Sequence, residues 1–306
     1  MTMATRQPKW SFADQIAHNR RQTVLVVGLM GAILFALVFA LGLLLDAPPV
    51  FTGVGTLLVV GIYLAITWNR SVDLVIRAAR ARPANPAVRE EQLLLHRVEE
   101  MAIASGLPTP RVYVQESDGI NAFAAGRDPK EAVVCVTTGA LRKLDQEELE
   151  GVIGHEMSHI LNYDVRLATV TVAVVGAIAM LSEIAIRALW FGGGRRGGGR
   201  GGGAGPLIIV ALVLIVLAPV FSRLVHLMLS RRREYLADAT GVRLTRNPEG
   251  LARALLKIKG DVAGEPPGSK TVAGLYISNP WRRMDLSSVL SSHPPLDERV
   301  ARIRRM

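Results

Sequence analysis

The segment Asp145-Gln-Glu-Glu-Leu-Glu-Gly-Val-Ile-Gly-His155-Glu156-Met-Ser-His159 decides the local fold, because it joins a helix start to a cluster of reactive side chains. Asp145 can cap the amide of Glu148, whose side chain can reach back, and this is the signature of a helix amino terminus. Side chains four residues apart project from one face of a helix, so His155 and His159 point the same way. The segment therefore predicts one helix that presents two imidazoles, with the carboxylate of Glu156 beside them.

This arrangement of side chains has a recognised metal chemistry. Two imidazoles at this spacing can bind one Zn²⁺. Glu156 can then take a proton from a water at the metal, whose pKa the zinc has lowered, so that the water attacks a peptide carbonyl at neutral pH. Replacing Glu156 is expected to spare the metal and abolish turnover. The alternative is that so short a pattern arises by chance on a helix whose histidines are merely packed or exposed.

A possible third ligand lies further along, in Arg233-Glu-Tyr-Leu-Ala-Asp238, where Glu234 and Asp238 share a helical face. Glu234 can complete a site of two histidines and one glutamate with one position open for water. Asp238 can accept a hydrogen bond from the outer nitrogen of a ligating histidine and fix its tautomer. Alone, this pair is more typical of a solvated charged face beside the neighbouring arginines. Together with the two histidines it predicts a metal centre.

Composition limits the class of protein. The chain has 306 residues, 50% of them hydrophobic, which suits one sizeable soluble domain plus a membrane anchor. The net charge of +10 does not indicate a nucleic-acid binder, because the arginines flank apolar runs and aromatic residues make up only 5%. A basic face toward anionic lipid explains the charge better. The single Cys135 excludes an internal disulfide framework, fits a reducing compartment, and leaves histidine and carboxylates as zinc ligands.

Four apolar runs are candidates for crossing a bilayer, since a spanning helix needs about 20 apolar residues. They are residues 23–45, 50–68, 167–191 and 206–228. The first run is too long for a signal peptide, and a second span follows it at once. The later pair is weaker, because Glu183, Arg187 and Arg223 lie in it, so these helices could instead dip into the lipid surface.

Arginines near the ends of these runs predict the orientation of the chain. Arg20 and Arg21 precede the first run and Arg70 follows the second, whereas the turn between them has none, which predicts both termini on the cytoplasmic side. Arg231 fits the same side. The arginines of the glycine-rich loop 192–205 would then lie outside, an objection that the loop's flexible composition softens without removing. We expect a multi-pass protein of a bacterial or archaeal cell membrane, with its catalytic domain in the cytoplasm.

The remaining sequence predicts a small sheet beside helices. Residues 90–105 have helical apolar spacing, and β-branched residues favour strands at 111–115 and 132–137. We expect an α+β, predominantly helical integral membrane protein with a zincin-like metalloprotease domain and about four hydrophobic helices. Its expected parts are an amino-terminal membrane hairpin (1–70), a first protease segment with the zinc helix (71–164), a second membrane hairpin with the glycine- and arginine-rich loop (165–229), and a second protease segment (230–306).

Several further motifs carry a family resemblance. They are the paired amino-terminal spans, Asn121-Ala-Phe123, Glu234-Tyr-Leu-Ala-Asp238, and Ser292-His-Pro-Pro295 with Arg299. With the histidine helix, they resemble the HtpX-type membrane metalloproteases, relatives of the CAAX prenyl proteases, in which a His-Glu-x-x-His helix and a downstream Glu-x-x-x-Asp helix jointly hold zinc. The resemblance covers most of the chain and implies one Zn²⁺ per chain, with Glu234 as third ligand and Asp238 as supporting partner. The long glycine- and arginine-rich loop departs from it.

The resemblance also implies roles that spacing alone does not assign. His293 would lie over the site and bind substrate or the tetrahedral oxyanion, although a loop histidine without a role is the alternative. Asn121, Ala122 and Phe123 would form the edge strand to which an extended peptide adds. Arg299 is expected in a surface salt bridge or as support for the site.

Two other classes of protein compete with this interpretation. An intramembrane site-2 type protease should carry its zinc motif inside an apolar span, whereas here charged residues 145–150 precede the motif directly. A catalytically silent membrane scaffold or holdase would normally close a structural zinc site with a fourth protein ligand. We therefore expect a zinc-dependent endopeptidase that cleaves membrane or misfolded proteins at the cytoplasmic membrane surface, in protein quality control. Its partners would be a protein substrate and the lipid bilayer but no nucleic acid, and its oligomeric state stays open.

Overall fold

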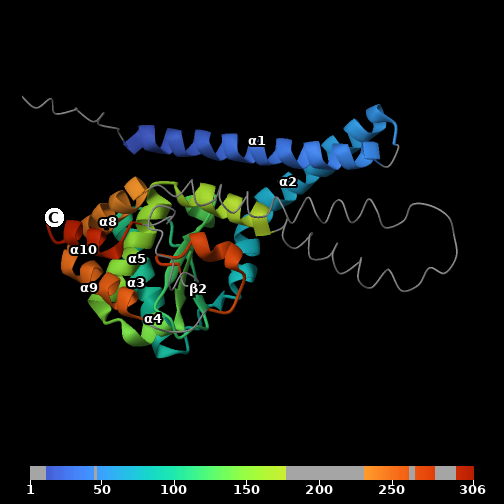
Figure 1. Cartoon of the computed structure of the whole chain (residues 1–306). Helices are drawn as coiled ribbons and strands as arrows, with labels where there is room; N and C mark the ends of the chain where they lie inside the picture. The colour runs from blue at the N-terminus through green and yellow to red at the C-terminus, as the bar shows by residue number, and fades with distance from the viewer. Residues whose placement is uncertain (1–11, 45–46, 177–230, 262–265, 280–293) are drawn as a thin grey trace, which may run out of the picture.

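The computed structural model describes residues 12–44, 47–176, 231–261, 266–279 and 294–306 (Figure 1). Helices α1 (Phe12–Leu44) and α2 (Pro49–Ala79) form a long pair, and α2 leads into a part in which helices surround a small sheet. The helices of this part are α3 (Arg89–Ser105), α4 (Thr138–Lys143), α5 (Gln146–Leu161), α8 (Arg231–Thr245), α9 (Pro248–Gly260) and α10 (Leu296–Ile303), with the 3₁₀ helices η1 (Pro129–Glu131) and η2 (Lys270–Gly274).

The sheet has four strands in the order β1-β2-β4-β3. They are β1 (Arg82–Pro83), β2 (Arg111–Gln115), β3 (Ala122–Ala125) and β4 (Val133–Thr137). The central strands β2 and β4 are parallel, while β1 and β3 pair antiparallel with their neighbours. Strand β3 therefore lies at an edge of the sheet, next to helix α5.

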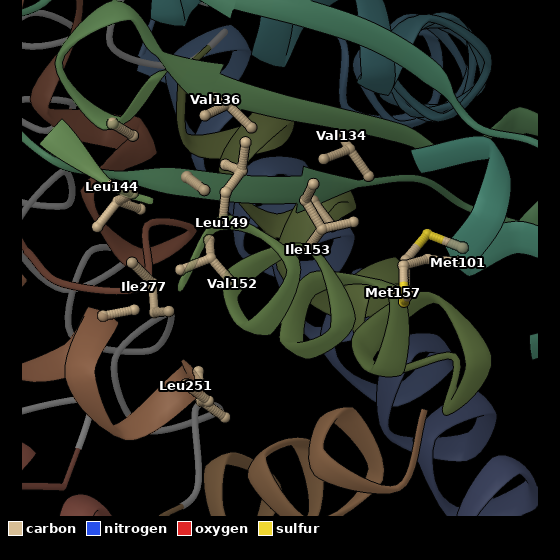
Figure 2. Packing of buried hydrophobic residues seen from close by; sticks show 14 of the residues in the cluster. Met101, Val134, Val136, Leu144, Leu149, Val152, Ile153, Met157, Leu251 and Ile277 are labelled. Carbon is tan, nitrogen blue, oxygen red and sulfur yellow. The ribbon is translucent and has the colours of Figure 1, made fainter. Parts of the chain in front are cut away.

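Alternate residues of the strands face two different apolar cores. Val134 and Val136 of β4 pack on the side of α3 and α5, where Figure 2 shows Ile153 of α5 beneath the sheet. Val133 and Cys135 face the opposite side, which α2 and η2 cover. A strand buried on both faces needs apolar residues at every position, and this explains why β4 is a continuous run rather than an alternating one.

Helix α5 begins with reciprocal hydrogen bonds between side chains and backbone amides. The Asp145 carboxylate accepts from the Glu148 amide at 2.9 Å, and the Glu148 carboxylate accepts from the Asp145 amide at 2.8 Å. The predicted capping box is thus confirmed. After Leu161 the chain turns through Tyr163, whose φ of 58° is left-handed, and Asp164 then precedes the apolar helix Val165–Gly176.

Helices α5 and α8 pack closely because glycines face each other where they cross. A Cβ at position 241 would lie 2.9 Å from the backbone nitrogen of His155, and a Cβ at position 154 would lie 3.2 Å from the carbonyl oxygen of Gly241. Only glycine leaves room for backbones at this separation. The pair Gly154 and Gly241 therefore brings the helix that carries the two histidines against the helix that carries Glu234.

Within the described residues, one helix is long and apolar enough to cross a membrane. It is α2, whose most apolar window has a mean hydropathy of 2.1. Many of its large apolar side chains are exposed, as are several of α1; examples are Phe51, Leu57 and Ile62 of α2 and Val24 of α1. Helix Val165–Gly176 is shorter and packs with α1 and α2 in the second apolar core. Exposed apolar surface of this extent suits contact with lipid.

The described fold agrees with the predicted strands and with the helix predicted at 90–105, each within one residue or so. The predominantly helical character is also confirmed. The four expected membrane helices are not: the fourth run and most of the third lie in residues 177–230, outside the described part of the chain.

Candidate metal centre

Three side chains from α5 and α8 converge on one point. His155, His159 and Glu234 offer ligand atoms that all lie within 4.8 Å of one another. The two Nε2 atoms are 3.2 Å apart, and each lies 3.8 Å from one carboxylate oxygen of Glu234. For metal bonds of about 2.0–2.1 Å, tetrahedral ligands lie about 3.3 Å apart. The donor set and its spacing therefore fit a single divalent cation.

A carboxylate stands behind each histidine. Asp238 Oδ1 lies 3.0 Å from Nδ1 of His155, and both oxygens of Asp164 lie 3.1 Å from Nδ1 of His159. Such a carboxylate accepts a hydrogen bond from Nδ1–H. The proton then stays on Nδ1, and the lone pair of Nε2 is available to a metal. Sequence reasoning gave this role to Asp238 but missed Asp164, because Asp164 reaches His159 only after the chain has turned at Tyr163.

Arg299 is completely buried beneath the cluster rather than at the surface. Its Nε and Nη2 donate to the two oxygens of Asp238 at 2.9 and 2.6 Å, and its Nη1 lies 3.3 Å from Glu234 Oε2. A two-pronged bond of this kind fixes a carboxylate in both distance and direction. Arg299 thus links α10 to α8 through Asp238, the same carboxylate that contacts His155. A surface salt bridge, one of the two roles expected for Arg299, is wrong, because the helix packs this side chain inward.

Glu156 lies beside the cluster, on the side of β3. Burial raises the pKa of its carboxyl to about 7, and the negative charge of Glu234 acts in the same direction. His159, the backbone N–H of Ala124 and Arg299 lower it again. A carboxyl with a pKa near neutrality can accept a proton and later return it, as general acid–base catalysis requires.

The two histidines differ in how they hold a proton. Burial lowers the pKa of both, but for His159 the carboxylates of Asp164, Glu234 and Glu156 together outweigh burial and raise the pKa to about 10. For His155 burial and the charge of Arg299 prevail over Asp238, so its pKa is lowered. A proton and a divalent cation compete for the same Nε2 atom, and the surrounding carboxylates attract either.

Sequence comparison shows which known proteins this chain resembles. The model of peptidase family M48 matches residues 89–306. The chain belongs to peptidase family M48. It is 43% identical over 297 residues to a protein named Protease HtpX homolog from Streptococcus gordonii, and 40% identical over 296 residues to one from Streptococcus uberis. Each match covers 96% of this chain and 99% of the relative.

A solved structure, the crystal structure of S. mikatae Ste24p, has a TM-score of 0.48 to this chain at 18% identity and covers 95% of this chain and 67% of that one. The family and the relatives identify the chain as a membrane-associated metalloprotease. They favour an enzyme over the scaffold or holdase alternative, and they confirm the predicted resemblance.

His155, His159 and Glu234 line a cavity that has both polar and apolar residues. Its polar lining residues include the two histidines, Glu156 and Glu234. Its apolar lining residues include Val165, Ala168, Leu275 and Ile277. Because Val165 and Ala168 belong to the apolar helix after α5, the cavity lies where that helix begins.

The predicted substrate strand is partly covered by the chain itself. The amide of Ile277 donates to the carbonyl of Ala122 at 3.0 Å, and the side-chain amide of Asn121 donates to the carbonyl of Ser278 at 2.7 Å. Phe123 is fully buried and pairs with β4. Peptide addition at these residues stays a prediction, and it requires residues 277–278 to move from this edge. His293 lies outside the described residues.

Proposed function

We propose that this M48 protease is a zinc-dependent endopeptidase that cleaves membrane or misfolded proteins at the cytoplasmic surface of the cell membrane. The convergence of His155, His159 and Glu234 beside a buried Glu156 carries the proposal. Two imidazoles and one carboxylate are the ligand set of a catalytic rather than a structural zinc site, because one position stays open for water or substrate.

The chemistry divides between the cation and the side chains. A bound zinc ion lowers the pKa of water and polarises a carbonyl oxygen. Glu156 accepts the proton from the attacking water and passes it to the leaving amine. Asp164 and Asp238 hold the two imidazoles in one tautomer and one orientation. His293 is proposed, on family resemblance, to bind substrate or the developing oxyanion.

Contacts between α1 and the metal helices support cleavage close to the membrane surface. The side-chain amide of Asn19 donates to the carbonyl of Asn162, and Nη2 of Arg233 donates to Gln22 at 2.5 Å. Both α1 residues lie just before its apolar run. The metal site is therefore at the level where α1 and the helix Val165–Gly176 become apolar.

The proposed membrane arrangement extends beyond the metal site. We propose four hydrophobic helices in two hairpins (1–70 and 165–229) that flank the two halves of the protease domain (71–164 and 230–306). Arginines near the ends of the first hairpin support a cytoplasmic catalytic domain. A reporter fused after Gly201 is expected outside the cytoplasm; a cytoplasmic signal would show that the later two runs do not both span.

Cleavage of an unfolded protein tests the activity directly. Purified full-length protein in detergent is incubated with an unfolded soluble substrate, with zinc or with chelator, and fragments are identified by mass spectrometry. We expect internal cleavage that requires zinc and is absent in Glu156→Gln. Cleavage that persists equally in Glu156→Gln would contradict the proposal.

A further inference from the structure

Two arginines lie near His155, His159 and Glu234, and only one of them is paired with carboxylates. Arg299 is fully buried and bonded to Asp238, and it does not line the cavity. Arg233 immediately precedes Glu234 in α8 and lines the cavity. Within the described part of the chain, Arg233 forms no ion pair, and its one hydrogen bond runs from Nη2 to Gln22 Oε1.

The other donors of Arg233 have no hydrogen-bond partner within the described part of the chain. A guanidinium has five N–H groups in a planar fork, and the bond to Gln22 occupies only one of them. Nη1 of Arg299 is fully buried and has no hydrogen-bond partner, whereas no nitrogen of Arg233 is both fully buried and unpaired. Since Arg233 lines the cavity, solvent or a bound molecule in that cavity can meet these N–H groups.

The surroundings keep this cation in place without neutralising it. Burial lowers the pKa of Arg233, while the charges of Asp164 and Glu234 act against that change. An arginine nevertheless stays charged in proteins. A partly buried cation with unused donors binds an oxygen acceptor more strongly than it would in water, because the local dielectric is low.

We propose that Arg233 is a substrate-binding residue that donates to a backbone carbonyl oxygen of the peptide next to the scissile bond. This inference rests on the proposed endopeptidase function. A peptide in the cavity brings carbonyl oxygens that lose their water, and the planar fork of Arg233 replaces those hydrogen bonds. Val165 and Leu275, which are apolar and line the cavity, contact the peptide side chains that lie between these carbonyl groups. A carboxylate at the end of a peptide offers the same oxygen chemistry, and the experiment separates the two.

Peptide binding, rather than turnover, is the measurement. Full-length Glu156→Gln protein in detergent with zinc binds a fluorescent peptide, taken from a fragment boundary of the cleavage assay, with both termini blocked. Adding Arg233→Gln should weaken binding at least about tenfold, as expected for loss of hydrogen bonds from a charged donor. Arg233→Lys should recover part of the loss. Zinc content should stay the same in all variants.

Gln22→Ala is the matched control, because it removes the contact between α1 and α8 and leaves the guanidinium intact. It should bind peptide within about twofold of the parent, a change well below one hydrogen bond to a charged group. Equal weakening by Gln22→Ala, loss of zinc in Arg233→Gln, or unchanged binding in Arg233→Gln would overturn the assignment. A peptide that binds only with a free carboxyl terminus would overturn the backbone carbonyl as its partner.

The two proposals fail in different ways. If the wild-type protein does not cleave the unfolded substrate, the endopeptidase function fails whatever Arg233 does. If cleavage is normal and Arg233→Gln binds the blocked peptide like its parent, only the role of Arg233 fails.

Discussion

Replacing Gly241 by alanine should separate the two helices that carry the metal ligands. The added Cβ would lie 2.9 Å from the backbone nitrogen of His155, whereas ordinary contacts begin at 3.4 Å. The atoms that it meets are backbone and cannot rotate away, so α5 and α8 must move apart by about 0.5 Å. Metal–ligand distances tolerate only about 0.2 Å. Glu234 should then no longer reach the cation at the same time as His155 and His159.

The expected cost has two parts that oppose each other. Alanine is a better helix former than glycine by about 1 kcal/mol, while overpacking against fixed atoms costs about 1–3 kcal/mol. We expect a lower Tm without metal and a zinc affinity reduced by at least about tenfold, comparable to the loss of a supporting residue.

A competition titration with a chromophoric chelator measures zinc affinity, and thermal unfolding with and without zinc measures stability. Gly260→Ala at the end of α9 is the matched control, because a Cβ there meets nothing within 4 Å. It should keep zinc affinity unchanged. If Gly241→Ala binds zinc as tightly as Gly260→Ala, the close crossing of α5 and α8 does not set the ligand distances.

Three other perturbations test separate contacts. Asp164→Asn keeps the size of the side chain but loses the charge facing His159 Nδ1, so zinc affinity should fall about 10–100-fold by chelator competition, while Asp128→Asn should leave it unchanged. The hydrogen bond from Arg82 lowers the pKa of the buried Glu91 carboxyl. The pair therefore stabilises the fold at pH values above the usual carboxyl pKa, and this stabilisation is lost as the pH falls through the lower pKa of the folded state. Glu91→Gln should therefore cost about 1–3 kcal/mol at pH 7, seen as a lower Tm, and a Tm difference that does not narrow toward pH 3 would contradict this. Removing the metal by dialysis against chelator should lower the Tm, since zinc at 100 times its Kd stabilises a fold by about 2.7 kcal/mol, and an unchanged Tm would indicate that the cluster binds none.

Local sequence patterns were sufficient for the elements that carry the site. The capping box at Asp145 and Glu148 follows from side chains three residues apart, and the structure confirms it. The shared face of His155 and His159 follows from helical geometry alone. The alternation between two cores in β4 was not predictable in the same way, because a continuous apolar run does not say what covers each face.

The rest of the site depends on contacts that no periodic pattern in the sequence encodes. Arg299 approaches Asp238 only because α10 packs against α8, and no spacing in the sequence encodes that approach. Asp164 reaches His159 through the left-handed turn at Tyr163. The cover that Ile277 gives to the β3 edge likewise joins residues far apart in the chain. Two of these contacts join segments far apart in the chain and the third depends on a left-handed turn, and the sequence carries no periodic signal for any of them.

The most direct test of the metal centre is zinc content measured on the same preparations that are assayed for cleavage. We expect one zinc ion per chain and internal cleavage for the wild type, one zinc ion and no cleavage for Glu156→Gln, and neither zinc nor cleavage for Glu234→Gln. Full zinc content and normal cleavage in Glu234→Gln would contradict the assignment of the third ligand and, with it, the site formed by α5 and α8.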